Sequence, residues 1–120
     1  MREEPKVSHR LIDGVCLVRV EGDVDVDSAE PLKQTLMCTD TRRATGTVVD
    51  LSAVRFADST MLHILLEAQR AHRASGLRLV ISGPLGLIVE RLFDVTGTTG
   101  FFTVAPSADT ALEMAGTPRR

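Results

Sequence analysis

Two kinds of segment alternate along the chain, and this alternation restricts the possible folds more than any other property of the sequence. Short, uninterrupted, β-branched runs such as "TVVDLSAV" at 47–54 and "LRLVIS" at 77–82 are typical of strands covered on both faces. Between them lie longer stretches whose apolar residues recur every three or four positions, as in an amphipathic helix. Because strands that alternate with helices are joined by right-handed crossovers, the sequence predicts an α/β fold with a mixed, mostly parallel sheet.

The first two strands are predicted to form an antiparallel hairpin. In "RLIDGVCLVRVEG" at 10–22, two apolar runs are joined by Asp13-Gly14, a dipeptide favoured where both central residues of a tight turn have positive φ. A helix is then expected over 26–38, because apolar residues follow at helical spacing. Either Asp25 or Asp27 is available as its N-cap.

Three further helices are predicted, which makes the order of elements β-β-α-β-α-β-α-β-α. The helix after "TVVDLSAV" is expected to end near Ser75, because Gly76 suits the left-handed position at a helix end. The next helix lies between Gly83-Pro84 and Thr96-Gly97. "FFTV" at 101–104 predicts a last short strand, and a small alanine-rich helix completes the fold.

The segment 53–57 is expected to be a loop, with Asp50 near the end of the preceding strand. Loops at the carboxyl ends of parallel strands are where sheets of this class usually meet ligands and partners. Functional residues are therefore expected at this edge.

Length and charge narrow the class of protein. A chain of 120 residues with 43% hydrophobic content is expected to form one domain over 1–120, with a core at about 10–115 and frayed termini. A net charge of -2 offers no basic field for nucleic acid. No apolar run is long enough to span a membrane and the polar start does not resemble a signal peptide, so a cytoplasmic protein is expected.

An acidic run at 23–27 resembles part of a calcium-binding loop. Asp23, Asp25 and Asp27 alternate like the first ligands of such a loop, but Ser28 stands where glycine is required and Gln34 where a bidentate glutamate is required. Calcium binding is therefore not expected. The run is interpreted as a solvated strand end and a helix cap, with the intervening valines pointing inward.

The histidines and cysteines do not form a metal motif. His63 and His72 are nine residues apart on one predicted helix rather than four, and both are expected at the surface or rim, with His9 in a mobile start. Cys16 and Cys38 lack metal-type spacing and are expected to be reduced, structural thiols. No metal or cofactor is predicted.

The stretch "RFADSTMLHILLEAQR" at 55–70 places two hydroxyl residues directly after an acid. Asp58 precedes Ser59 and Thr60 where a strand-like pattern gives way to a helical one. By itself the triplet predicts a helix start at which the Asp58 carboxylate accepts from a backbone N–H two or three residues on. A helix N-terminus also favours negative charge, so the fold is expected to tolerate a phosphate on Ser59.

Three stretches resemble the signature regions of the STAS domain (sulphate transporter and anti-sigma-factor antagonist), particularly the stand-alone bacterial anti-anti-sigma factors. In the second of them, Asp50-Leu51, Phe56 and Asp58-Ser59-Thr60 follow one another as in that family. The stretches are "GDVDVDSAEPLKQTL" at 22–36, "VVDLSAVRFADSTML" at 48–62 and "GLRLVISGPLGLIVERLFDVTG" at 76–97.

The resemblance implies a switch between protein partners. The unphosphorylated form of such a protein binds an anti-sigma factor that is also a serine kinase, which frees a sigma factor. The kinase phosphorylates the serine and a serine phosphatase restores it. By position, Ser59 is the acceptor and Thr60 the alternative acceptor, while Asp58 orients the hydroxyl or contacts the kinase. Asp25 and Phe56 match family positions near the same partner-binding surface. Because partners perform the chemistry, the protein is expected not to be an enzyme.

Two positions depart from the family pattern. Thr98 replaces a leucine, and Met61 replaces the glycine after the hydroxyl pair. Methionine fills space that glycine leaves open to another backbone, so either the kinase contact at Met61 is altered or Met61 packs beneath the loop as core. The alternative function is a STAS module that senses a ligand or acts as a scaffold without phosphorylation. An enzyme built on Asp25, Asp50 and Asp58 would require these acids to meet in a pocket.

Overall fold

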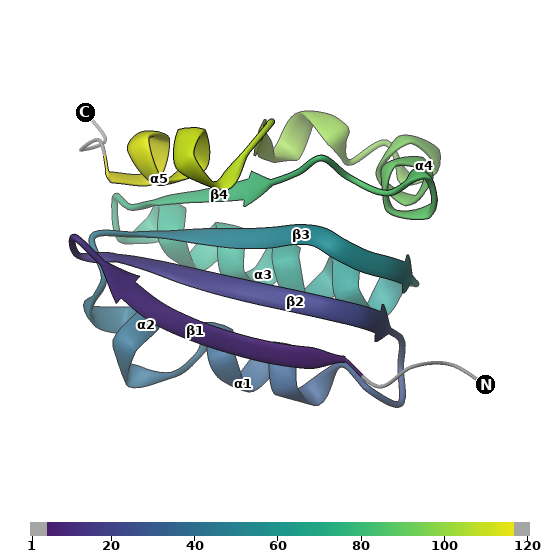
Figure 1. Cartoon of the computed structure of the whole chain (residues 1–120), viewed down its shortest axis with the longest axis horizontal. Coiled ribbons are helices and arrows are strands. Elements are labelled where there is room, and N and C mark those ends of the chain that lie inside the picture. Colours follow the sequence, from purple (N-terminus) through teal and green to yellow (C-terminus); the bar gives the residue numbers. More distant parts are fainter. Residues whose placement is uncertain (1–4, 117–120) are drawn as a thin grey trace.

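The computed structural model describes residues 5–116, in which the order of strands in the sheet follows their order along the chain (Figure 1). The antiparallel hairpin consists of β1 (Lys6–Ile12) and β2 (Val15–Val24), and its turn has positive φ at Asp13 and Gly14. The next strands, β3 (Gly46–Ala57), β4 (Arg78–Ser82) and β5 (Thr103–Ala105), each pair in parallel with the strand before. The predicted sheet and hairpin are therefore confirmed.

The four predicted helices are present, together with two short additions. The long helix α3 (Ser59–Ala74) and the helix α4 (Leu87–Thr96) end close to the predicted glycines, and Gly76 and Gly97 have positive φ. The additions are a helix of five residues, α2, and a 3-10 turn, η1. The remaining bounds are α1 (Glu30–Leu36), α2 (Thr39–Arg43), η1 (Thr99–Phe101) and α5 (Ala108–Gly116). None of these helices has the length and apolar character needed to cross a membrane.

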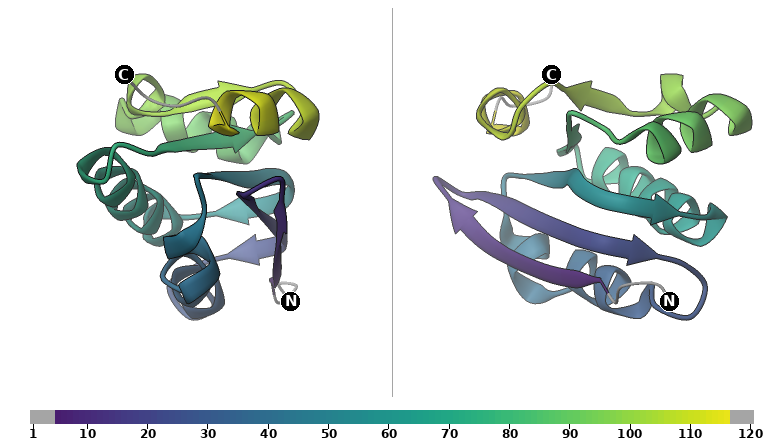
Figure 2. Two further views of the ribbon diagram at one scale, coloured as in Figure 1. Left: turned by 90° about the vertical axis from the view of Figure 1, so that its left-hand side faces the viewer. Right: turned by 45° about the vertical axis from the view of Figure 1, so that its right-hand side comes forward.

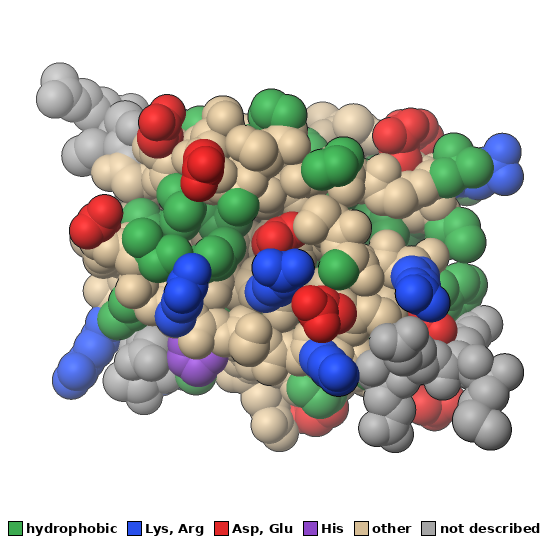
Figure 3. All heavy atoms as spheres, in the orientation of Figure 1, with side chains coloured by type: hydrophobic (Ala, Val, Ile, Leu, Met, Phe, Trp, Pro, Cys, Tyr) green, Lys and Arg blue, Asp and Glu red, His purple; other side chains and the backbone are tan. Residues whose placement is uncertain are grey.

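Alternate residues of the strands build two clusters, one on each face of the sheet. Figure 2 shows α1, α2 and α3 together on one side of the strands. That side holds the larger cluster, to which Val18, Val49 and Ile81 belong. On the opposite face α5 packs through Ala111 and Ala115. Over the rest of this face, acidic and basic side chains are interspersed (Figure 3), including the pair Arg19–Glu21 at 3.3 Å.

The first helix begins later than the sequence predicts. It starts at Glu30 rather than at residue 26, its N-cap is Ala29 and neither Asp25 nor Asp27 caps it. Instead the Asp25 carboxylate accepts from the Asp27 amide and from the Ser28 hydroxyl, which holds 25–28 in a turn. Pro31 lies in the first turn of the helix, as expected.

The segment 53–57 is the last part of β3 and not a loop. It continues to pair with β2, from Glu21↔Ala53 to Val24↔Ala57, although the register between the two strands shifts twice after Asp50. Asp50 therefore lies in the middle of a strand, opposite Ser82, where pairing between β3 and β4 stops. Gly83-Pro84 ends β4 there, whereas β3 continues to Ala57.

Several side-chain placements differ from expectation. His72 is buried rather than at the rim, Val26 is 72% exposed rather than inward, and His9 lies in β1, which begins before residue 10. Cys16 and Cys38 are not joined in a disulfide, as expected. The expected fraying at 117–120 falls outside the described residues.

Candidate functional site

The signature segments meet because β2 and β3 end side by side. The last residues of these two parallel strands, Val24 and Ala57, are register partners. The strand contact continues one residue further, since the Asp58 amide donates to the Val24 carbonyl at 3.2 Å. The turn at 25–28 and the start of α3 are therefore neighbours, although they are far apart in the sequence.

Asp58 caps α3 and also holds the turn that precedes α1. Its Oδ1 accepts from the Thr60 amide at 2.9 Å, as the sequence predicts, and its backbone is extended, as an N-cap requires. Its Oδ2 accepts from the Val26 amide at 3.2 Å. Both carboxylate oxygens thus help to fix the backbone. The contact with Val26 was not predicted by the resemblance to the STAS family.

Asp25 orders the turn on the other side of this contact. Its Oδ1 accepts from the Asp27 amide at 3.0 Å and from the Ser28 hydroxyl at 2.8 Å. The Ser28 oxygen in turn accepts from the Asp25 amide at 3.0 Å. Asp25 therefore lies close to Asp58, because the turn that it orders contains Val26, whose amide donates to Asp58.

Ser59, the expected acceptor, is the first residue of α3 and is exposed. It borders a shallow groove of about 420 Å³ between α1 and α3, to which Thr60 also contributes. Their helical neighbours His63 and Glu67 continue the same side of the groove. The other residues that line it are Val26, Asp27, Ala29, Glu30, Lys33 and Ile64. Ser59 thus lies on an open surface, directly beside the α1–α3 groove.

The charges around Ser59 are mainly acidic. Asp27, Glu30 and Glu67 line the groove with one basic side chain, Lys33, and the Asp58 carboxylate immediately precedes Ser59. A phosphate there would benefit from the positive end of α3 but would be added to an already negative surface. The first turn of α3 itself contains no acidic residue.

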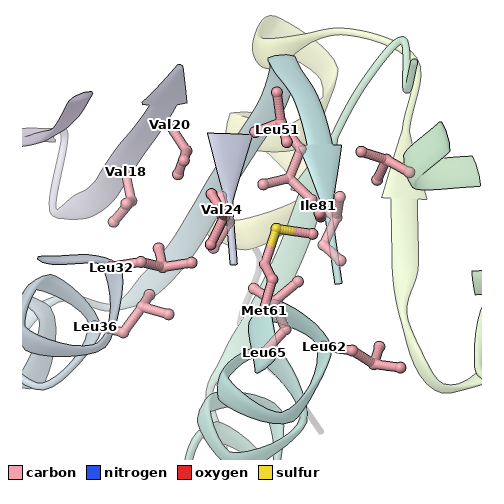
Figure 4. Packing of buried hydrophobic residues seen from close by; sticks show 14 of the residues in the cluster. Val18, Val20, Val24, Leu32, Leu36, Leu51, Met61, Leu62, Leu65 and Ile81 are labelled. Atoms are coloured by element: carbon pink, nitrogen blue, oxygen red, sulfur yellow. The ribbon is translucent and has the colours of Figure 1, made fainter. Parts of the chain in front are cut away.

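Met61 is a core residue and is not presented to a partner. Its side chain is fully buried, pointing away from the surface that Ser59 occupies, and lies among Val24, Leu65 and Ile81 (Figure 4). Of the two readings of this position, the structure supports packing beneath the site over a direct contact. The Met61 side chain therefore offers no exposed surface for a partner to contact.

Phe56 is half-buried and pairs in register with Asp23 at the end of the sheet. Next to this part of β3 lies a second groove, of about 760 Å³, which the sequence analysis did not identify. It runs between the end of β3 and the start of α4, where Leu87 and Ile88 are exposed. The remaining lining residues are Glu21, Gly22, Ser52, Ala53, Val54, Arg55 and Gly86.

The acids proposed for an enzyme are not grouped in one pocket. Asp50 accepts from the amide and the hydroxyl of Ser52 on the face of the sheet that α5 partly covers. Asp25 and Asp58 are instead bound to the turn and the helix start at the end of β2. Within 5–116 there is also no group of three or more histidine, cysteine or acidic side chains arranged to hold a metal ion.

This fold and site define a known class of protein. The family model described as "Mlab, STAS domain" matches residues 8–104. The chain therefore belongs to the STAS domain family, as the three sequence stretches indicated. No curated protein matches the sequence.

The chain is similar in structure to bacterial regulators. An anti-sigma factor antagonist from Mycobacterium paratuberculosis has 26% sequence identity and a TM-score of 0.80, over 95% of this chain and 96% of that one. The anti-sigma factor antagonist SpoIIAA in its unphosphorylated form has 16% identity and a TM-score of 0.76, over 93% and 98% of the two chains. Bacillus SpoIIAA in its phosphorylated form has 14% identity and a TM-score of 0.69, over 91% and 98%.

Proposed function

We propose that this chain is an anti-sigma factor antagonist whose binding is switched by phosphorylation of Ser59. The unphosphorylated form binds an anti-sigma factor that is also a serine kinase and releases a sigma factor, and a serine phosphatase reverses the modification. The observation that carries the proposal is the exposed Ser59 at the start of α3, directly after the Asp58 cap and beside the α1–α3 groove. The likeness to the Mycobacterium paratuberculosis antagonist supports it.

The switch follows from charge. A phosphate adds about -1.5 to -2 charge and three strong acceptor oxygens. The surface already carries Asp27, Glu30 and Glu67, so the phosphate adds to its negative charge. A partner that accommodates only the neutral Ser59 hydroxyl then binds more weakly. A penalty of about 3 kcal/mol weakens binding by roughly 150-fold.

The fold accommodates the modification. Ser59 is the first residue of α3, where unsatisfied backbone N–H groups and the helix dipole favour an anion. The Met61 side chain points into the core, so the replacement of the family glycine leaves the Ser59 side of the helix open. In this proposal the chain performs no catalysis, because the kinase and the phosphatase supply every chemical step.

Phosphosite mapping tests the proposal. The protein is incubated with ATP and native-host lysate under phosphatase inhibition, and intact and fragment masses are recorded. We expect one phosphate on Ser59, none in Ser59→Ala, and unchanged modification in Thr60→Val, which keeps the backbone amide that Asp58 uses. Modification of Thr60 instead, or an unmodified chain, contradicts the proposal.

The second candidate is a ligand-sensing or scaffold module that works without serine chemistry. The groove of about 760 Å³ beside 53–55, with the exposed apolar side chains of Leu87 and Ile88, favours it. Ligand-observed NMR against a nucleotide panel distinguishes the two candidates. If a nucleotide binds, and Ile88→Ser abolishes this binding while Ser59→Ala leaves it unchanged, the result supports the ligand-sensing module. If no nucleotide binds, the result favours the anti-sigma factor antagonist.

A further inference from the structure

A cluster of thiols lies at the opposite end of β2 from the Asp58 site. The Sγ atoms of Cys16 and Cys38 lie 3.6 Å and 3.4 Å from the same atom, Oγ1 of Thr41. The Thr41 hydroxyl donates its own proton to the Thr35 carbonyl at 2.8 Å. Its oxygen is therefore the acceptor toward the sulfurs, and the two thiols share one hydroxyl.

The two sulfurs differ in exposure and in the rigidity of their surroundings. Cys16 is fully buried within β2, whereas Cys38 is half-buried in the short link between α1 and α2. The distance between the sulfurs cannot exceed the sum of their distances to Thr41. A disulfide bond is about 2.05 Å long, so the two sulfurs must move into direct contact to be bridged.

An imidazole lies on the other side of Cys38. Nε2 of His9 is 3.9 Å from the Cys38 Sγ, and His9 is exposed on the edge strand β1. The Cys38 thiol can therefore donate a hydrogen bond to the Thr41 oxygen or to the His9 ring nitrogen, and of these two only the imidazole is basic enough to take its proton. Transfer to His9 leaves a thiolate, the form of cysteine that reacts with electrophiles.

Cys38 is only partly buried, so a small oxidant can reach it from the surface beside Met37. A hollow of about 410 Å³ between α2 and the end of α3 is lined by Met37, Thr41 and Arg42 among others. Met37 directly precedes Cys38 and is 55% exposed.

We propose that Cys38 is a peroxide-reactive cysteine and that Cys16 resolves it to an intramolecular disulfide, with His9 and Thr41 as positioning residues. The Cys38 thiolate attacks the terminal oxygen of a hydroperoxide, the O–O bond breaks, and an alcohol or water leaves with the proton. The sulfur is oxidised by two electrons to sulfenic acid. The Cys16 sulfur then attacks the Cys38 sulfur, the S–O bond breaks, and the Cys16 proton leaves with the hydroxide as water.

The disulfide would tie the end of α1 to β2 without involving Ser59. Cys16 lies at the start of β2, while the turn at 25–28 follows its end. This modification is therefore independent of the proposed function, and each stands if the other fails.

Mass spectrometry of the peroxide-treated full chain tests the proposal. Wild type should lose the mass of two hydrogen atoms, with a Cys16–Cys38 cross-linked peptide that a reductant cleaves. Oxidation of the exposed Met37 adds an oxygen instead, and Met37→Leu removes this background. Cys16→Ala should stop at a sulfenic acid on Cys38 that dimedone traps, since the resolving thiol is gone.

The matched variants make the outcome decisive. In Cys38→Ala, a substitution outside the core, the native chain should not consume peroxide through the buried Cys16. In His9→Gln, the initial rate at Cys38 should fall several-fold. Faster reaction at Cys16 than at Cys38, a disulfide only between chains, or no reaction of Cys38 at all overturns the proposal. An unchanged rate in His9→Gln overturns the assignment of His9.

Discussion

Oδ2 of Asp58 accepts a hydrogen bond from the amide of Val26, a residue 32 positions earlier, while Oδ1 of the same carboxylate accepts from Thr60. One side chain therefore fixes two backbone segments, the turn before α1 and the start of α3. Ser59 follows this side chain directly. The geometry around the proposed acceptor is thus held by hydrogen bonds that two backbone amides donate to the Asp58 carboxylate.

Removing the Asp58 carboxylate should destabilise the fold. Loss of an N-cap costs about 0.5–2 kcal/mol, and we expect Asp58→Ala to fall at the upper end, because the Val26 amide loses its partner as well. Urea unfolding measures the change. Ser59→Ala, one residue along and exposed, serves as the control and should change stability by less than about 0.5 kcal/mol. Equal effects of the two substitutions contradict the role assigned to Asp58.

Replacing Met61 by the glycine usual in the family should lower the free energy of unfolding. Truncation of a fully buried methionine costs about 2–5 kcal/mol, and glycine within a helix adds about 1 kcal/mol. Met61→Leu keeps the volume and should cost less than about 1.5 kcal/mol. Thermal unfolding of both variants checks the order. If Met61→Gly is as stable as Met61→Leu, Met61 is not the core residue described above.

His72 should make stability depend on pH. Burial lowers the pKa of His72 below its usual 6.5, although its bond to the Ala68 carbonyl opposes this. The unfolded chain therefore binds a proton more readily, so the contribution is complete above about pH 6.5 and is lost as pH falls through the lower folded pKa.

The matched variants isolate this effect. His72→Gln removes the titrating group that contacts Thr47 at 2.7 Å, and should flatten the pH dependence of the unfolding free energy below neutrality. His63→Gln removes an exposed histidine of the same helix and should leave the pH dependence of the unfolding free energy unchanged. Urea titrations at several pH values below neutrality measure the unfolding free energy of both variants. If the stability of His72→Gln falls more steeply with pH than that of wild type, His72 is not the source of the pH dependence.

The contact between α5 and β3 should not tolerate a side chain at Gly46. A Cβ there would collide with the Ala115 carbonyl oxygen, which belongs to the backbone and cannot rotate away. Gly46→Ala should therefore cost at least about 1–3 kcal/mol, as overpacking does. A Cβ at Gly100 meets nothing within 4 Å, so Gly100→Ala is the control and should be close to neutral. Hydrogen exchange should show α5 opening first in the Gly46 variant.

Most of the fold was predictable because its local signals agree with the tertiary contacts. Asp13-Gly14 specified the hairpin, and the glycines after α3 and α4 marked where those helices end. The start of α1 was missed because Asp25 and Asp27 were each available as its cap. The structure resolves the competition through Ser28, whose hydroxyl binds Asp25 and stabilises a turn instead.

The site was predictable only in part, since the groove beside Ser59 depends on how α1 and α3 pack against each other. The sequence indicated Ser59 and its acidic neighbour through a contiguous motif. It did not indicate Lys33 and Glu67, which face the groove from two helices far apart in the chain. Spacing from Ser59 along α3 identifies His63 as a neighbour, but only the packing of α1 shows that a groove lies there.

The order of the strands has a consequence for synthesis on the ribosome. Each strand pairs with the one that emerged just before it, and none must enter between two that are already joined. The sheet can grow at a single edge, so each new strand closes only the one crossover that joins it to the strand before, and the entropic cost of closure rises slowly with the length of that crossover. Once the chain has emerged from the ribosome as far as Ala74, the exposed part contains β1, β2, β3 and α3, and the Asp58 contact to Val26 can form before α4 and α5 emerge.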